Sequence, residues 1–123
     1  MHELSVAQQL VELVVAELGD EAAARVRAVT LRLGALSGVA SEALLSVYGA
    51  AAAGTPLRDS TLAIDPVAAA VFCRRCDREH ELPGVQSLRC PACHSGDAHV
   101  TRGRELEVLS VEVAEDADPA GGG

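Results

Sequence analysis

Four cysteines form two short motifs of the same spacing in the second half of the chain. Cys73 and Cys76 bracket two residues in CRRC, Cys90 and Cys93 bracket two residues in CPAC, and thirteen residues (77–89) separate the motifs. A two-residue spacing lets a tight turn aim both sulfurs at one ion, and two such turns complete a tetrahedron. Because four protein ligands leave no open position for water, the pattern predicts a structural Zn(II) rather than a hydrolytic one.

Three other interpretations of these cysteines stay open. CPACH at 90–94 matches the C-x-x-C-H pattern of c-type haem attachment, but that would leave Cys73 and Cys76 without a role and would require export. A redox-active pair would need a motif that follows a strand and opens a helix, and Pro91 fits a zinc turn better. Iron held by four sulfurs is chemically allowed, and spacing alone does not separate it from zinc.

Three histidines, His80, His94 and His99, lie in or beside the cysteine segment. The simpler interpretation is that they are solvent-exposed loop side chains. The sharper hypothesis is that His94, directly after Cys93, competes with a cysteine for zinc. Because histidine titrates near neutral pH, such an exchange would make the zinc site sensitive to pH.

The chain opens Met1-His2-Glu3, which is a second group of candidate metal ligands. An unperturbed amino terminus has a pKa of about 8, so a fraction of the Met1 amine is expected to be unprotonated at neutral pH. The amine, the His2 backbone nitrogen and the His2 imidazole can form fused chelate rings on one ion, and the Glu3 backbone nitrogen can add a ligand. Nitrogen-rich, square-planar coordination suits Ni(II) or Cu(II) rather than zinc. A histidine near a chain end is, however, more often simply solvated.

Composition narrows the possible partners. The formal net charge is −8, and all the basic residues are scattered arginines, so the basic patch that nucleic acids and anionic membranes require is missing. Aromatic residues make up 2% of the chain, too few to stack on bases. The acidic start, interrupted by Gln8, Gln9 and Glu12, does not resemble a secretory segment. We therefore expect a cytoplasmic protein with reduced thiols and no nucleic-acid or membrane partner.

An amphipathic helix is predicted at residues 3–18, so the amino terminus should lie on its first turn. Gly19 is suited to end that helix. Its apolar stripe consists of Leu4, Ala7, Leu10, Val11, Val14 and Leu18.

Alternating apolar and polar residues predict strands at 26–34, 61–67 and 105–113, and Pro66 places the second at a sheet edge. A second helix should lie between the first two strands, with Ser41 as its N-cap and a stop at Gly54. The cysteine segment interrupts two strands that could pair, as an insert at the end of the sheet.

Several of these segments together resemble one family, the HypA/HybF hydrogenase maturation factors. They are MHELSVAQQL at the start, VRAVTLRLGALSGV in the first strand and loop, CRRC and CPACHSGD, and GRELEVLSVEV near the end. The resemblance runs in order from Met1 to about Val113. The opening Met-His-Glu is its most specific part, because paired C-x-x-C motifs occur in many zinc ribbons. SGVASEAL departs from the family in having Ser41 where many members have proline.

The resemblance implies an α/β fold in which two helices pack on a small three-stranded sheet with an inserted zinc-ribbon module. It implies a nickel-binding domain at 1–70 and 103–114 and a zinc-binding module at 71–102. The tail at 115–123 is acidic and then rich in Pro and Gly, so we expect it to be disordered. It also implies that Met1, His2 and Glu3 bind Ni(II) and that Cys73, Cys76, Cys90 and Cys93 bind Zn(II). The implied partners are the GTPase HypB, the [NiFe]-hydrogenase large-subunit precursor and, in some members, urease accessory proteins.

Two functions from different classes follow. The first is a nickel metallochaperone that takes part in hydrogenase maturation without catalytic chemistry of its own. The second is a zinc-ribbon interaction adaptor in which Met-His-Glu is incidental. We find no nucleophile–base arrangement in the sequence, and the zinc coordination is complete, so an enzyme is not predicted. Blocking the amino terminus separates the two, because only a chaperone would lose nickel binding.

Overall fold

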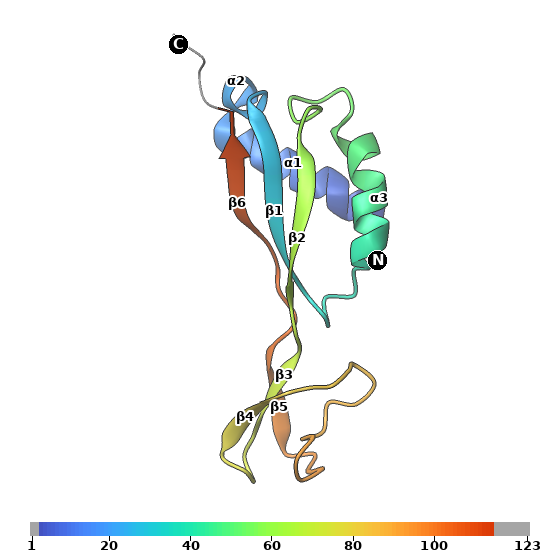
Figure 1. The fold of residues 1–123 in the computed structure, drawn as a ribbon, viewed down its shortest axis with the longest axis vertical. Helices are drawn as coiled ribbons and strands as arrows, with labels where there is room; N and C mark the ends of the chain where they lie inside the picture. Colours follow the sequence, from blue (N-terminus) through green and yellow to red (C-terminus); the bar gives the residue numbers. More distant parts are fainter. Residues whose placement is uncertain (1–2, 115–123) are drawn as a thin grey trace. The chain divides into compact units, whose positions relative to one another are not determined.

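The computed structural model describes residues 3–114, which form six strands and three helices (Figure 1). Met1, His2 and the predicted tail at 115–123 lie outside the described residues. Among the residues described, no helix combines the length and apolarity that crossing a bilayer would require. In chain order the elements are α1 (Glu3–Leu18), α2 (Asp20–Ala23), β1 (Val26–Gly34), α3 (Ser41–Ala52), β2 (Thr61–Val67), β3 (Ala70–Cys73), β4 (Arg78–Glu81), β5 (Ala98–Arg102) and β6 (Leu106–Val113).

The first sheet has the order β2-β1-β6, which confirms the three predicted strands. Strand β1 is central because it has the strongest alternation, with Val29, Leu31 and Leu33 all buried. Strands β2 and β6 flank it and do not pair with each other, so the expected pairing across the cysteine segment is wrong. Pro66 lies on the edge strand β2, as predicted, where its missing N–H costs no ladder hydrogen bond.

The second sheet, β4-β3-β5, is antiparallel and was not foreseen from the sequence. Its strands are only four or five residues long, too short to show a clear alternation. Val71 pairs with His80 on one side and with Val100 on the other. Such short strands depend on tertiary contacts for their stability.

Contacts divide the chain into two compact units. The first holds the described residues up to Thr30, Ala40–Ala63 and the chain from Val108; the second holds Leu31–Val39 and Ile64–Glu107. Strands β1, β2 and β6 each continue from one unit into the other. The division into a nickel-binding and a zinc-binding domain stays a prediction.

In the first unit, α1 packs against α3 (Figure 1). Helix α1 has the predicted bounds, and Gly19, at φ 84°, follows its end. The predicted apolar stripe is shifted, since Leu4 and Leu18 are 43% and 36% exposed whereas Val6 is buried. The two ends of the stripe therefore lie outside the packed interface.

Helix α3 begins one residue earlier than predicted. Its N-cap is Ala40, which has extended backbone angles, and Ser41 is already the first helical residue. The expectation that Ser41 caps the helix is therefore wrong. The cap residue, Ala40, makes no side-chain hydrogen bond to the helix. The helix ends at Ala52, before Gly54 at φ 76°.

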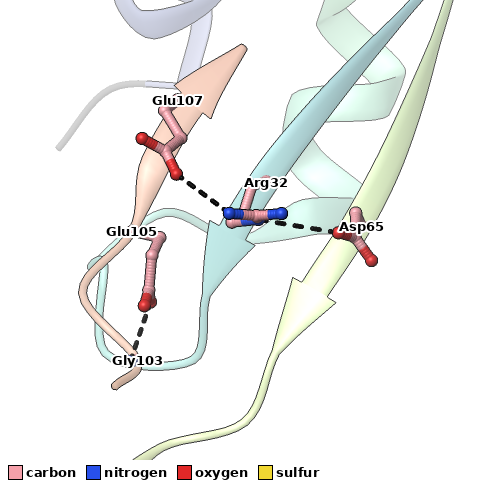
Figure 2. A network of polar contacts seen from close by, with 5 residues as sticks. All are labelled: Arg32, Asp65, Gly103, Glu105 and Glu107. Atoms are coloured by element: carbon pink, nitrogen blue, oxygen red, sulfur yellow. Dashed lines mark hydrogen bonds and ion pairs between the residues drawn. The ribbon is translucent and has the colours of Figure 1, made fainter. Parts of the chain in front are cut away.

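In the second unit, an arginine joins the three strands of the first sheet. Arg32 on β1 lies 3.3 Å from the Glu107 carboxylate of β6 and 3.7 Å from the Asp65 carboxylate of β2 (Figure 2). Glu105, just before β6, instead accepts a 2.8 Å hydrogen bond from the Gly103 N–H. Strand β6 starts at Leu106 rather than at the predicted residue 105.

The backbones of two glycines approach each other closely in this unit. A Cβ placed on Gly34 would lie 2.1 Å from the Gly103 carbonyl oxygen, and Gly103 itself has φ +120°. The Leu36 N–H donates to that carbonyl at 2.6 Å, and the Gly34 N–H donates to the Glu105 carbonyl at 2.7 Å. Any side chain at position 34 would therefore break backbone hydrogen bonds that hold the loop after β1.

We expect Gly34→Ala to lower the free energy of unfolding by about 3 kcal/mol, because the atoms that the new methyl meets are backbone and cannot rotate away. Gly49→Ala is the matched control, since a Cβ there meets nothing within 4 Å and Gly49 lies inside α3. The control should stabilise by about 0.5–1 kcal/mol. Urea unfolding measures both, and equal effects of the two substitutions would contradict the close approach.

Candidate metal centre

The two C-x-x-C motifs adopt matching turns. The Cys76 N–H donates to the Cys73 sulfur at 3.4 Å, and the Cys93 N–H donates to the Cys90 sulfur at 3.5 Å. The residue after each motif, Asp77 at φ 58° and His94 at φ 64°, is left-handed. Asp77 and His94 also donate their N–H to the carbonyl of the first cysteine, each at 2.8 Å. Each turn therefore aims both of its sulfurs to one side, as the spacing predicted.

The four sulfurs converge on one point. The ligand atoms of Cys73, Cys76, Cys90 and Cys93 all lie within 4.8 Å of one another. The sulfurs of Cys73 and Cys93 are 3.6 Å apart, and those of Cys76 and Cys90 are 3.8 Å apart. Sulfurs bound to zinc at about 2.3 Å would lie about 3.8 Å apart at the corners of a tetrahedron. These separations are far longer than a disulfide bond of about 2 Å, so the cluster fits a structural Zn(II).

The second sheet positions both turns. Cys73 ends β3, and the turn from Cys73 to Cys76 leads into β4. The other turn precedes β5, and the Arg74 N–H in the first turn donates to the carbonyl of Asp97, the residue directly before β5, at 3.0 Å. The core beneath the turns is small: Ala69, Val71 and Leu82 are buried, with Leu36, Ala98 and Val100 packed against them. So little apolar burial makes the cysteine cluster a main source of stability for this sheet.

Two of the four thiols, Cys76 and Cys90, differ in how firmly they hold their protons. Hydrogen bonding to Cys93, together with burial, raises the pKa of Cys76 to about 12. Burial also acts to raise the pKa of Cys90, but N–H donors from Cys93 and Ala92 and the neighbouring thiols outweigh it and lower that pKa to about 6. Thiolates this close repel one another, so they cannot all ionise until a cation joins them.

The three histidines differ in environment. His94 is exposed, as expected, and among the described residues it is not part of the group of four cysteines that could hold a metal ion. His99 is exposed but lies on β5, where its ring is 5.8 Å from that of Phe72. His80 lies on β4 and is half-buried, and its Nε2 has no hydrogen-bond partner. The expectation of loop histidines is therefore wrong for His80 and His99, because the sheet that contains them was not foreseen.

Of the predicted nickel ligands, only Glu3 is among the residues that the structure describes. Met1 and His2 lie outside them. Glu3 is the first residue of α1, and its carboxylate Oε2 accepts a 3.1 Å hydrogen bond from the Ala40 N–H at the start of α3. Sequence reasoning did not foresee this contact, because nothing in the spacing of Glu3 and Ala40 signals it.

Comparisons with known proteins agree on one family. The family model for "Hydrogenase/urease nickel incorporation, metallochaperone, hypA" matches residues 1–113. The hydrogenase maturation factor HypA of Roseiflexus sp. (strain RS-1) is 41% identical over 120 residues, which is 98% of each chain. That of Chloroflexus aggregans is 40% identical over 112 residues, covering 91% of this chain and 98% of its own. The solution structure of the nickel metallochaperone HypA from Helicobacter pylori covers 92% of this chain and 97% of its own, with a TM-score of 0.64 and 24% identity, and supports the fold.

X-ray absorption on the zinc-loaded protein should show four sulfur neighbours of zinc at neutral pH. Because His94 is exposed and outside the cysteine group, the same four sulfurs should remain at mildly acidic pH. His94→Ala should then leave the spectrum and the zinc stoichiometry unchanged. Cys90→Ser should lower zinc retention during chelator competition, because it removes one corner of the tetrahedron. A nitrogen neighbour that appears on acidification and is lost in His94→Ala would establish the exchange hypothesis instead.

Zinc affinity should rise with pH between about 6 and 8, since zinc must displace the proton that the raised pKa keeps on Cys76. Below about pH 6 the Cys90 thiol is protonated as well, so zinc must displace a second proton and its affinity should depend on pH more steeply there. Competition with a chromophoric chelator at several pH values measures the slope. An affinity that is flat across this range would show that the thiols are already ionised without metal.

Proposed function

Because the chain belongs to the HypA family of hydrogenase and urease nickel-incorporation metallochaperones, we propose that Met1, His2 and Glu3 capture the Ni(II) that it delivers. As a member of that family, the protein is a nickel metallochaperone of hydrogenase maturation. The observation that carries the proposal is that the family match extends to the first residue, and so includes the Met-His-Glu segment. Nickel is the cargo of this site rather than a resident cofactor.

The chemistry of the chain end supports nickel rather than zinc there. The Met1 amine, the His2 amide nitrogen and the His2 imidazole form adjoining chelate rings, and the Glu3 amide nitrogen completes a nitrogen-rich set. Glu3 is the first residue of α1, so its amide nitrogen lies at the start of that helix. A site at a chain end can also pass its ion to an acceptor more readily than an enclosed site can.

The second metal has a different role in this proposal. We infer that Cys73, Cys76, Cys90 and Cys93 hold a Zn(II) that stabilises the β4-β3-β5 sheet and takes no part in catalysis. The four donors leave no position for water or substrate, so zinc would act here only through structure. The protein would therefore bind and deliver a metal and would not be an enzyme.

For partners, the proposal names the GTPase HypB, the [NiFe]-hydrogenase large-subunit precursor as the recipient, and urease accessory proteins where a urease is present. It places the protein in the cytoplasm, where thiols remain reduced. The net charge of −8 supports protein partners over nucleic acid.

Calorimetric titration of the zinc-loaded protein with Ni(II) tests the nickel site. One added residue before Met1 should abolish tight nickel binding, because it converts the chelating amine into an amide, and His2→Ala should do the same. The matched control adds one residue after Gly123 and should bind nickel as the native protein does.

Two other outcomes would overturn the proposal. Equal binding by all forms would place the nickel site elsewhere in the chain. Absence of binding in every form would favour the zinc-ribbon adaptor.

A further inference from the structure

Helix α3 starts without the capping residues that its position calls for. In a capping box, a Ser or Thr at the N-cap pairs with a Glu or Gln at the third helical residue, whose side chain accepts the N-cap N–H. The corresponding residues here are Ala40 and Ala43, neither of which has an acceptor side chain. Ser41 lies one position too late to cap. The N-cap N–H must therefore find its acceptor elsewhere.

That acceptor comes from the other helix. The Glu3 carboxylate Oε2 lies 3.1 Å from the Ala40 nitrogen, which is the bond that the third-residue carboxylate of a capping box would make. Glu3 is half-buried and lies in the first turn of α1, which packs on α3. One carboxylate thus serves the positive amino-terminal ends of both helices.

We propose that Glu3 is a positioning residue: its carboxylate fixes the amino-terminal segment to the start of α3 and so presents the nickel-binding nitrogens. This inference rests on the proposed nickel site. Fixing residue 3 reduces the freedom that the chain has to lose at this place, so less conformational entropy is lost when nickel binds. The carboxylate also offsets the positive helix ends, which would otherwise disfavour a cation at this place.

The proposal assigns the two parts of Glu3 to different tasks. Its backbone nitrogen remains a candidate nickel ligand, whereas its carboxylate acts through α3 and not by coordinating the ion. A direct ligand and a positioning group would both lose nickel affinity in Glu3→Ala, so that substitution alone does not distinguish them. A variant that displaces the carboxylate from α3 without removing it does distinguish them.

The combination Ala40→Ser with Ala43→Glu provides this variant, because it gives α3 a complete capping box of its own. The local carboxylate should take the N–H of residue 40 and release Glu3. We expect nickel affinity, measured by calorimetry on zinc-loaded protein, to fall about three- to tenfold, the range that loss of one hydrogen bond supports. Adding Glu3→Ala to this background should then cause little further loss.

Three more measurements complete the test. Glu3→Ala alone should lower nickel affinity by a similar factor and speed amide exchange at residue 40 in the nickel-free protein. Glu3→Gln keeps an oxygen acceptor, so it should retain part of the nickel affinity and part of the protection of the residue 40 amide from exchange. Glu12→Ala, which removes an exposed carboxylate further along α1, is the matched control and should change neither.

Unchanged nickel affinity in the capping-box variant, with loss on adding Glu3→Ala, would overturn the proposal and make the carboxylate a direct ligand. If the native protein shows no nickel binding that depends on its amino terminus, the proposed function fails and the positioning role fails with it. Amide exchange in Glu3→Ala would then still report the contact with α3 as a helix cap only.

Discussion

Four cysteine sulfurs within 4.8 Å of one another set the strongest constraint on this protein. Thiolates at this separation repel, and the pKa values of about 12 for Cys76 and about 6 for Cys90 show how unevenly protons are shared without a metal. A divalent cation among the sulfurs would offset this repulsion and displace the protons that the thiols still hold. The β4-β3-β5 sheet has few buried apolar side chains, so it depends on this cluster more than a larger sheet would.

The second unit combines the cysteine cluster with close backbone packing. Gly34 lies so close to the Gly103 carbonyl that there is no room for a Cβ at position 34. This close approach allows the backbone hydrogen bonds from Leu36 to Gly103 and from Gly34 to Glu105. Leu36, two residues beyond Gly34, then packs on the small core formed by Ala69, Val71 and Leu82. The loop that follows β1 is thereby fixed to the unit that contains the cysteines, before the chain continues into α3.

The amino-terminal segment is held by a different kind of contact. A structural zinc site must be closed, whereas a site that delivers its ion must remain accessible to an acceptor. The Glu3 carboxylate accepts a hydrogen bond from the Ala40 N–H and so links the start of α1 to the start of α3. In the proposed function this contact positions Glu3, whereas four cysteine side chains hold the zinc.

The sequence alone determined what depends on local spacing. The C-x-x-C turns, the bounds of α1, β1 and β2, and the stop at Gly19 all follow from residues close together in the chain, and the family resemblance rests on the same short segments. Tertiary structure decided what depends on distant partners. Ser41 is the first helical residue rather than the cap, and the Ala40 N–H finds its acceptor on Glu3, 37 residues earlier in the chain. Strand β1 lies between β2 and β6, which therefore do not pair with each other. The second sheet was missed because its strands are short and share a small core with distant residues, neither of which leaves a periodic signal in the sequence.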